Sequence, residues 1–363
     1  MFHYVWLRDC CYCDECGDCY SSLRQYVPDL RSLDSRPDNI SWQDGVLTIR
    51  WKDGHQSVYS SQWLNENRYD DQARAARRIP YRYWDGSSDV SEFTFDFELA
   101  QNDESKRLSL QKSLIENGIA IIKNGPATPG GVLDFAGLFG AVEQSAYGAI
   151  FDLTPGNAIG TAGTTLRAVP PHSDEAFAYT PPGIEALACV IPAEEGGDSI
   201  LVDGFGIAQK LRQQSPKGFD LLATWNHHYV RMHQDKLDQR AFAPVIALDD
   251  DGEISGIRIH TRASAPLDIP QEVMEDYLDA YHRLCAMMMS PENQLQINLG
   301  AGEAIIFDNH RALHSRTAFS DRNRHLQICS VPREKFHESF RLLATRTGHT
   351  ALANSVLRAG ACR

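Results

Sequence analysis

The sequence predicts an α+β protein that is mainly β: a jelly roll or β-sandwich decorated by helices, preceded by a small β-rich domain. Three observations lead to this fold class. Short apolar segments typical of strands dominate the second half of the chain. The glycine-rich phosphate loop and the repeated β–α alternation that would indicate a parallel sheet are both missing from the sequence. Five of the nine cysteines fall between residues 10 and 19, ahead of a strand and a tight turn.

The composition excludes several classes of protein. The chain has 363 residues, enough for two or three domains, and its 42% hydrophobic and 23% charged residues are ordinary for a folded protein rather than a disordered one. The net charge of −13 and the lack of a basic run argue against nucleic-acid binding. No apolar stretch approaches the roughly 18 residues of a membrane span, and Arg8 and Asp9 interrupt any apolar signal region. We therefore expect a cytoplasmic protein that binds neither nucleic acid nor membrane.

Residues 1–80 are expected to form a zinc-binding β domain with a linker. Residues 46–51 have a strand pattern, residues 52–54 form a turn, and His55 follows that turn. The clustered cysteines of a reduced protein indicate a metal site rather than a disulfide framework; free surface thiols are the alternative. Such close thiolates can enclose one Zn²⁺ only if a fourth ligand comes from elsewhere, and the turn is suited to present His55. The polar residues 67–97 are expected to be the linker.

The second domain is expected over residues 95–363. A helix that carries Leu108 and Leu114 is predicted to end before Gly118, since glycine is typical of the residue after a helix. A short buried strand follows at 119–122. Further helices are predicted at about 132–139, 205–214 and 271–289, and further strands at 186–191, 199–202, 245–248, 257–259, 305–307 and 325–331.

A histidine and a carboxylate two residues apart, His172 and Asp174, are the first candidate metal ligands. Residues i and i+2 of a strand point to one face, so both side chains can reach one metal. A second histidine is expected from residues 308–316, which contain His310 and His314. Two histidines and one carboxylate leave three coordination positions open, as in the facial triad of non-haem Fe(II) oxygenases. Taken alone, the His-x-Asp pattern is weak evidence for a metal site. A histidine on a strand that simply pairs with a nearby carboxylate would give the same pattern.

Two further features follow these ligands in a consistent order. Arg324 lies ten residues after His314, and an arginine pairs bidentately with a carboxylate such as the distal end of 2-oxoglutarate. Residues 196–199, Gly-Gly-Asp-Ser, open a strand and offer the Ser199 hydroxyl to the same carboxylate.

With these motifs in order, the chain resembles the γ-butyrobetaine dioxygenase and trimethyllysine dioxygenase family, within the taurine dioxygenase-like group. The resemblance covers nearly the whole chain, and the cysteine motif in front of the iron motif is its most specific part. It rests on residues 6–9, Cys11-x-Cys13-x-x-Cys16, residues 161–163, His172-x-Asp174, and residues 181–183, 196–199, 202–205, 307–309, 313–314 and 324–326.

The resemblance implies a double-stranded β-helix (jelly roll) catalytic domain, Fe(II), 2-oxoglutarate and O2 as reactants, and a homodimer. The residues that it implies are His172, Asp174 and His314 for Fe(II), Arg324 and, more weakly, Ser199 for 2-oxoglutarate, and Cys11, Cys13, Cys16 and His55 for a structural Zn²⁺. Cys10 and Cys19 fall outside the motif.

The substrate pocket departs from the family pattern. The family encloses a trimethylammonium group in aromatic faces, but Gly160 and Ser330 stand where it has two of these aromatics. Tyr147 and Phe151 match two other aromatics of the family, although they could instead be residues that only pack in the core. A partial cage with added charge implies a zwitterion other than γ-butyrobetaine, such as an amino acid or an amine with a carboxylate or phosphonate. The candidate substrate residues are the aromatics Tyr147 and Phe151, the carboxylate-binding Asn157, and the charged Glu175 and Arg262.

We therefore expect an Fe(II)- and 2-oxoglutarate-dependent dioxygenase that hydroxylates an aliphatic C–H of a small charged metabolite. One alternative is a non-catalytic zinc-binding interaction protein on a jelly-roll scaffold, against which the complete triad and Arg324 argue. Another is a cupin-type hydrolase or isomerase that uses the same metal without 2-oxoglutarate. Succinate formation in the presence of Fe(II) would distinguish the dioxygenase from both of these alternatives.

Overall fold

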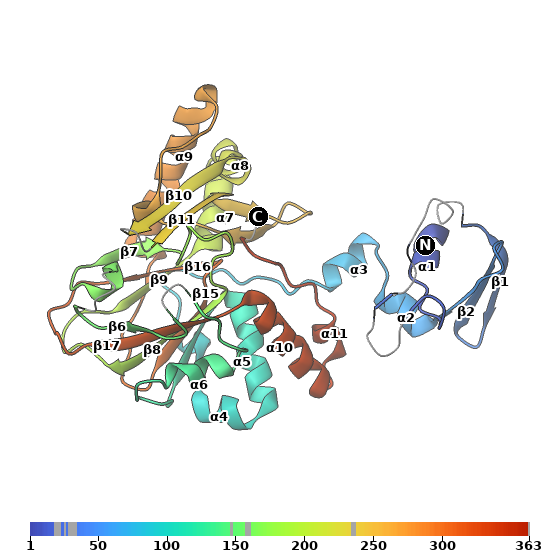
Figure 1. Ribbon diagram of the computed structural model, residues 1–363, viewed down its shortest axis with the longest axis horizontal. Helices are drawn as coiled ribbons and strands as arrows, with labels where there is room; N and C mark the ends of the chain where they lie inside the picture. Colours follow the sequence, from blue (N-terminus) through green and yellow to red (C-terminus); the bar gives the residue numbers. More distant parts are fainter. Residues whose placement is uncertain are drawn as a thin grey trace. The chain divides into compact units, whose positions relative to one another are not determined.

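The computed structural model describes residues 1–17, 23–24, 27, 35–145, 148–156, 161–233 and 237–361. The chain forms two compact units, Met1–Arg78 and Ile79–Arg363 (Figure 1). None of the helices in the described ranges combines the length and the apolar composition that a membrane crossing needs.

The first unit is built on a small antiparallel sheet in the order β1 (Pro37–Gln43), β2 (Val46–Trp51) and β3 (Gln56–Ser60). Its core is small and consists of Leu7, Ile49, Trp51, Tyr59 and Leu64. The predicted strand at 46–51 is confirmed. So is the turn after it, where Gly54 adopts φ +89°, a left-handed conformation that glycine tolerates best. The unit's helices are α1 (Tyr4–Asp9), α2 (Ser61–Glu66) and α3 (Asp71–Ala76).

The prediction that residues 67–97 form a linker is wrong for their second half. Trp84 and Phe93 are buried in the core of the second unit. Trp84 also donates a hydrogen bond from its indole nitrogen to the Asn117 carbonyl oxygen at 2.7 Å. The segment then continues through a 3₁₀ turn, Val90–Phe93, into strand β4 (Thr94–Asp96). Isolated apolar residues among polar ones anchor this segment, whereas composition alone indicated a linker.

Two sheets face each other in the described part of the second unit. Apart from the parallel pair β4–β5, their strands are antiparallel. Side chains such as Leu187 and Phe307 of the larger sheet pack against Leu201 and Ala312 of the smaller one. The larger sheet has the order β4, β5 (Ile119–Lys123), β15 (Ala304–Asp308), β8 (Ile184–Ile191), β17 (His325–Val331), β6 (Phe151–Leu153), and the smaller sheet has the order β14 (Leu295–Ile297), β9 (Ser199–Asp203), β16 (Ala312–Arg316), β7 (Val169–His172).

Helices cover the outer face of each sheet, so the two sets lie on opposite sides of the unit in Figure 1. The larger sheet is covered by α4 (Phe97–Asn102), α5 (Glu104–Asn117), α6 (Val132–Gly137) and α10 (Arg333–Arg346). The smaller sheet is covered by α7 (Gly204–Gln214), α8 (Pro216–Thr224) and α9 (Gln271–Met289), with strands β12 (Ile246–Leu248) and β13 (Ile254–Ile257). The remaining elements are the hairpin β10 (Asn226–His233) and β11 (Leu237–Pro244), the 3₁₀ turns Ala162–Thr164, Thr261–Ala263 and Pro291–Asn293, and α11 (Thr350–Ala353).

Most of the predicted elements of this unit are present. The helix before Gly118 ends as expected, because Gly118 adopts φ +74° and its N–H donates to the Leu114 carbonyl oxygen at 2.8 Å. The helix predicted to reach residue 139 ends at Gly137. The strand predicted at 257–259 lies earlier, since its ladder with β12 ends at Ile257. The β10–β11 hairpin was not predicted, because polar side chains interrupt the apolar pattern of β10.

Candidate active site and metal centre

The three candidate iron ligands meet at the edge of the smaller sheet. β7 and β16 are antiparallel neighbours in which His172 and His314 stand directly opposite each other. Strand β7 ends at His172, so Asp174 does not lie on the strand predicted for it. Ser173 leaves the ladder and donates its N–H to the Ile259 carbonyl oxygen at 2.7 Å, and Asp174 follows in a turn. The turn still directs the carboxylate at both imidazoles.

Asn309 fixes this turn from the connection between β15 and β16. Its amide oxygen accepts the Asp174 N–H at 2.7 Å, and its amide nitrogen donates to the Asp174 carbonyl oxygen at 3.1 Å. The same nitrogen donates to the Pro182 carbonyl oxygen at 3.0 Å. Glu175, the next residue in the turn, has φ +46°, a left-handed conformation that is uncommon for a non-glycine residue. These bonds hold Asp174 in one position.

The ligand atoms of the three side chains face one another. Asp174 Oδ1 lies 3.4 Å from His172 Nε2, and Asp174 Oδ2 lies 3.5 Å from His314 Nε2. His172 Nδ1 is 3.0 Å from the Pro170 carbonyl oxygen, which places the ring proton on Nδ1 and leaves the Nε2 lone pair toward the cluster. This is the tautomer that a metal bound at Nε2 requires.

The charges of the cluster suit a divalent metal. Burial acts to raise the pKa of the Asp174 carboxyl, but the nearby His314 and His172 rings outweigh it and hold that pKa below its usual range. Burial lowers the pKa of His314 to about 4, so the ring is neutral at pH 7, as a metal ligand must be. The donor set of two imidazoles and one carboxylate therefore fits the facial triad of a non-haem iron site.

The structure distinguishes the two downstream histidines. His310 is buried away from the cluster, where its Nε2 lies 3.2 Å from the Pro181 carbonyl oxygen and its Nδ1 accepts the Ala361 N–H at 3.0 Å. His260 lies beside the cluster although its spacing gave no signal. Its ring centroid is 4.7 Å from that of His172, and burial lowers its pKa to about 3.

A cavity of about 500 Å³ opens onto the three ligands. Its walls come from both sheets, from β10 and from the 3₁₀ turn at Thr261–Ala263. Three other predicted positions, Tyr147, Asn157 and Gly160, lie outside the described residues. The predicted co-substrate and substrate residues that line it are Phe151, Glu175, Ser199, Arg262 and Arg324.

Two buried arginines, Arg316 and Arg324, line this cavity. Arg324, just before β17, donates to the Gly197 carbonyl oxygen at 2.9 Å, and its guanidinium carbon lies 4.9 Å from the Phe319 ring centroid. Arg316 was not predicted, although it stands two residues after His314 on β16 and so shares its face. It donates to the Gly163 carbonyl oxygen at 2.8 Å, and burial, followed by the charge of Arg324, lowers its pKa to about 10. Both groups stay positive at pH 7.

Acidic groups also line the cavity. Burial, together with neighbouring carboxylates, raises the pKa of Glu175 to about 7. Glu185 was not predicted, because it is a single acid within the otherwise apolar strand β8. Burial, followed by the charge of Asp174, raises its pKa well above the usual range. Arg262 is a basic residue that lines the same cavity, and burial lowers its pKa.

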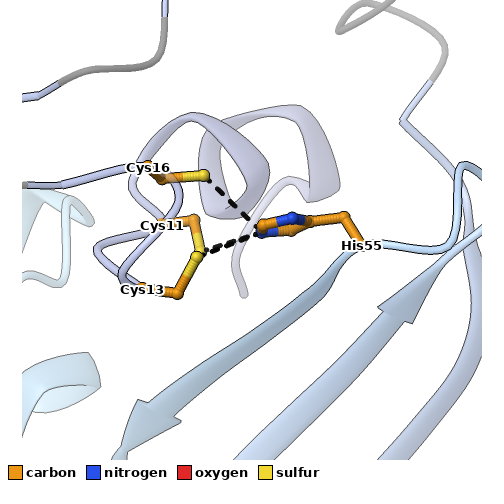
Figure 2. Close-up of side chains that lie close together, drawn as sticks. All are labelled: Cys11, Cys13, Cys16 and His55. Carbon is orange, nitrogen blue, oxygen red and sulfur yellow. Dashed lines mark hydrogen bonds between the residues drawn. The ribbon is translucent and has the colours of Figure 1, made fainter.

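The second cluster lies in the first unit and joins three cysteines to one histidine. Figure 2 shows the sulfur atoms of Cys11, Cys13 and Cys16 directed at the ring of His55, which follows the β2–β3 turn. The distances from His55 Nε2 to these sulfurs are 3.4, 3.6 and 3.6 Å. Tetrahedral zinc with ordinary Zn–S and Zn–N bonds separates sulfur from nitrogen by roughly 3.5 Å. The donor set and spacing therefore fit a closed zinc site.

Groups around this cluster orient and neutralise it. His55 Nδ1 lies 3.3 Å from a Glu15 carboxylate oxygen, which leaves Nε2 toward the sulfurs. Arg8 is buried, donates to Cys16 Sγ at 3.5 Å and lies 3.6 Å from an Asp53 carboxylate oxygen. Cys10 is half-buried outside the four-residue group, and Cys19 lies outside the described residues.

Comparison with known families matches both units. Residues 80–330 match the family described as "Taurine catabolism dioxygenase TauD, TfdA family". Residues 1–65 match the family described as "Gamma-butyrobetaine hydroxylase-like, N-terminal".

Curated relatives match along most of their length. The chain is 33% identical over 347 residues to the gamma-butyrobetaine dioxygenase of Pseudomonas sp. (strain AK-1), covering 92% of this chain and 88% of that protein. It is 29% identical over 353 residues to the mitochondrial trimethyllysine dioxygenase of Rattus norvegicus, covering 94% and 82%. An asparagine oxygenase solved with Fe(II), 2S,3S-3-hydroxyasparagine and succinate shares the fold, with a TM-score of 0.51 at 18% identity, over 65% of this chain and 83% of that one.

Proposed function

The chain belongs to the taurine catabolism dioxygenase TauD, TfdA family, and on this premise we propose that it is an Fe(II)- and 2-oxoglutarate-dependent dioxygenase that hydroxylates an aliphatic C–H of a small charged metabolite. The observation that carries the proposal is the cluster of His172, Asp174 and His314 at the wall of a cavity that also contains Arg324. The cavity is large enough for 2-oxoglutarate together with a small substrate.

His172, Asp174 and His314 would hold the iron. When bound, Fe(II) supplies activation of O2 coupled to the oxidative decarboxylation of 2-oxoglutarate, so that one oxygen atom enters the substrate C–H and the other enters succinate. The protein positions the reactants and excludes water. Arg324 would bind the distal carboxylate of 2-oxoglutarate by a charge-assisted bidentate pair, with the Ser199 hydroxyl as a further donor. Apolar side chains in the cavity wall, among them Leu187 and Leu326, limit the access of water.

Three further features of the protein are proposed: the jelly-roll arrangement, the zinc site and the homodimer. A jelly-roll arrangement is supported by the two facing antiparallel sheets with the iron cluster at one edge. A structural Zn²⁺ at Cys11, Cys13, Cys16 and His55 is supported by the tetrahedral spacing of the four ligand atoms. A homodimer is proposed by resemblance, and light scattering of the purified protein tests it.

The substrate is proposed to be a small zwitterion. Named relatives are dioxygenases of γ-butyrobetaine and trimethyllysine, which both carry a cation and a carboxylate. Glu175 and Arg262 line this cavity and would meet a substrate cation and a substrate anion, and Phe151 would pack beside them. Ser330 lines the cavity where the family has an aromatic, which supports a cation other than trimethylammonium.

A non-catalytic zinc-binding scaffold is the weaker alternative. Such a module has no use for a metal-binding triad beside a cavity with buried arginines, and the relatives are named as dioxygenases. A hydrolase or isomerase of the same fold would have no use for Arg324.

The proposal is tested with a panel of small zwitterions that contains quaternary amines, aminophosphonates and basic amino acids. Each is incubated with the protein, Fe(II), 2-oxoglutarate and O2, and succinate and product mass are measured together. We expect succinate to form in step with a product heavier by one oxygen atom. Failure of every member to raise succinate above the metal-free control contradicts the proposal.

A further inference from the structure

An acid and a hydroxyl stand side by side in the wall of the cavity. Glu185 of β8 and Ser330 of β17 are register partners, and the Ser330 hydroxyl donates to a Glu185 carboxylate oxygen at 3.0 Å. The neighbours along the same faces, Leu187 on β8 and Ile328 on β17, are apolar and line the same cavity. The cavity therefore has one polar position in an otherwise apolar part of its wall.

Glu185 lacks a positive partner within the described residues. It is only 2% exposed, yet no salt bridge reaches it in the part of the chain that the structure describes. The charged groups that act on it most are acidic, namely Asp174, Glu175 and Glu143. Burying a carboxylate without a compensating charge is costly. A cation brought in by a ligand would compensate this group.

The acid is also close to the candidate iron site. In the larger sheet Glu185 is the register partner of Phe307 on β15. The Phe307 ring centroid is 4.8 Å from that of His314. Glu175 lines the same cavity and directly follows the ligand Asp174. A cation held between Glu185 and Glu175 would therefore lie next to the reacting centre.

We propose that Glu185, with Glu175 and Ser330, forms a cation subsite that selects a substrate carrying an N–H-bearing cation, a primary ammonium or a guanidinium, over a quaternary ammonium. The inference rests on the proposed oxygenase function and names its substrate class. A carboxylate and a hydroxyl accept hydrogen bonds, which ammonium and guanidinium groups can donate. A quaternary ammonium has no N–H, and it is best bound by aromatic faces instead. The arginines on the other walls, Arg262 and Arg231, would meet the substrate anion.

The test compares ligands that differ only in N-methylation. The pairs are 4-aminobutyrate with γ-butyrobetaine and lysine with Nε-trimethyllysine, and 4-guanidinobutyrate and arginine test the guanidinium. Binding is measured by calorimetry on the full chain with Fe(II) and 2-oxoglutarate under anaerobic conditions, and turnover is measured separately as succinate. The wild-type protein is expected to bind at least one N–H-bearing ligand more than tenfold more tightly than its methylated partner. A preference for the methylated partner in both pairs overturns the proposal.

Glu185→Gln removes the charge and keeps the shape and the hydrogen bond with Ser330. We expect it to weaken binding of the preferred ligand at least tenfold, with no change for the methylated partner or for the affinity of 2-oxoglutarate. Glu143→Gln is the matched control, since Glu143 lies close enough to act on Glu175 and Glu185 but is not among the residues that line the cavity. Equal binding by wild type and Glu185→Gln means that Glu185 is only structural and overturns the inference. Absence of succinate in the iron-loaded wild type counts against the oxygenase function instead, so the two failures are distinguishable.

Discussion

Asn309 controls the geometry of the candidate iron site although it would not touch the metal. Its two hydrogen bonds to the backbone of Asp174 replace the strand ladder that ends at His172. Asn309 is thus a positioning residue, and its neighbour His310 serves the fold in a similar way through Pro181 and Ala361. Side chains one to five residues apart in this segment therefore have different tasks, since His314 is a candidate metal ligand whereas Asn309 and His310 hold the backbone.

The choice between His310 and His314 gives the first prediction. His314→Ala removes a ligand and should lower Fe(II) affinity more than tenfold, because even residues that only orient a metal ligand change affinity by about 10–100-fold. His310→Ala should lower Tm, since it loses buried hydrogen bonds, and should leave Fe(II) affinity nearly unchanged. Anaerobic Fe(II) titration by calorimetry measures both. The reverse pattern would reject the assignment of His314.

Arg324 gives the second prediction. Losing a hydrogen bond to a charged group costs about 1.5–3 kcal/mol, so Arg324→Ala should raise KM for 2-oxoglutarate by roughly 10–100-fold. Arg324→Lys should retain part of the affinity, because it keeps the charge but not the planar fork. The exposed Arg322, two residues earlier, supplies the control variant. An unchanged KM in Arg324→Ala would mean that Arg316 or another group binds the co-substrate.

Residue types and spacing were enough to single out most of the residues that the structure brings together. The cysteine cluster and the turn before His55 indicated a metal site, and the family resemblance implied Cys11, Cys13 and Cys16 among the five clustered cysteines. Spacing could not separate His314 from His310, because both lie in one segment. The resemblance implied His314, and the β7–β16 register places that residue opposite His172. Glu185 was missed because it is a single acid in the otherwise apolar strand β8, and Arg316 was missed because nothing in the local sequence distinguishes it from the other arginines of the segment. The role of each depends on the cavity that it faces.

At the scale of elements, the β2–β3 hairpin carries the third prediction. The first unit has a small core, so a bound metal would supply much of its stability. Elemental analysis should find about one zinc per chain, as a single closed site requires. His55→Ala and Cys13→Ser should lose zinc and unfold the first unit at a lower temperature. Cys10→Ser is the matched control, and full zinc retention in both test variants would refute the site.

Packing between β10 and α9 carries a pH prediction. His227 on β10 is buried, its ring centroid lies 4.5 Å from that of Tyr281, and its Nε2 lies 2.9 Å from the Ser264 hydroxyl. Burial, and then the charge of His228, lowers its pKa to about 4 from the ordinary 6.5. Protons therefore bind the unfolded chain more readily. The stability contributed by the neutral ring is fully present above pH 6.5 and is lost as the pH falls toward 4.

His227→Gln removes this titration. Between pH 6.5 and 4 the wild type should lose roughly 3 kcal/mol more unfolding free energy than the variant. Urea unfolding at a series of pH values measures the difference. The exposed His282 on α9 supplies the control, since His282→Gln should retain the wild-type pH dependence. Parallel pH dependence of wild type and His227→Gln would show that the buried ring does not govern acid stability.

Strand and helix placement in the second unit was predictable where apolar runs were long. Strands β5, β8 and β15 follow directly from such runs. The β10–β11 hairpin escaped prediction because its strands carry polar side chains, and the polar stretch before β4 hid two buried aromatics. In both cases tertiary packing determines the structure, and the local pattern of apolar and polar residues does not predict it.

For the whole molecule, the arrangement of two facing sheets explains why the site residues are scattered through the sequence. His172 and His314 come from neighbouring strands of one sheet, while Glu185 and Ser330 come from the other. The cavity between these walls brings the candidate metal ligands, buried arginines and acids together. The candidate chemistry therefore depends on the second unit as a folded whole, and the Cys11, Cys13, Cys16 and His55 cluster belongs to the first unit.

Succinate formation from 2-oxoglutarate is the most direct test of the oxygenase assignment. Succinate is measured for the wild type and for Asp174→Ala, each with the substrate panel and in the presence and absence of Fe(II). The zinc content and Tm of both proteins are measured in parallel. We expect succinate formation to require both Fe(II) and O2 and to fall to background in Asp174→Ala, while the zinc content and the fold stay as in the wild type. Equal succinate from the wild type and a folded Asp174→Ala variant, or none from the iron-loaded wild type with any member of the panel, would contradict the oxygenase assignment.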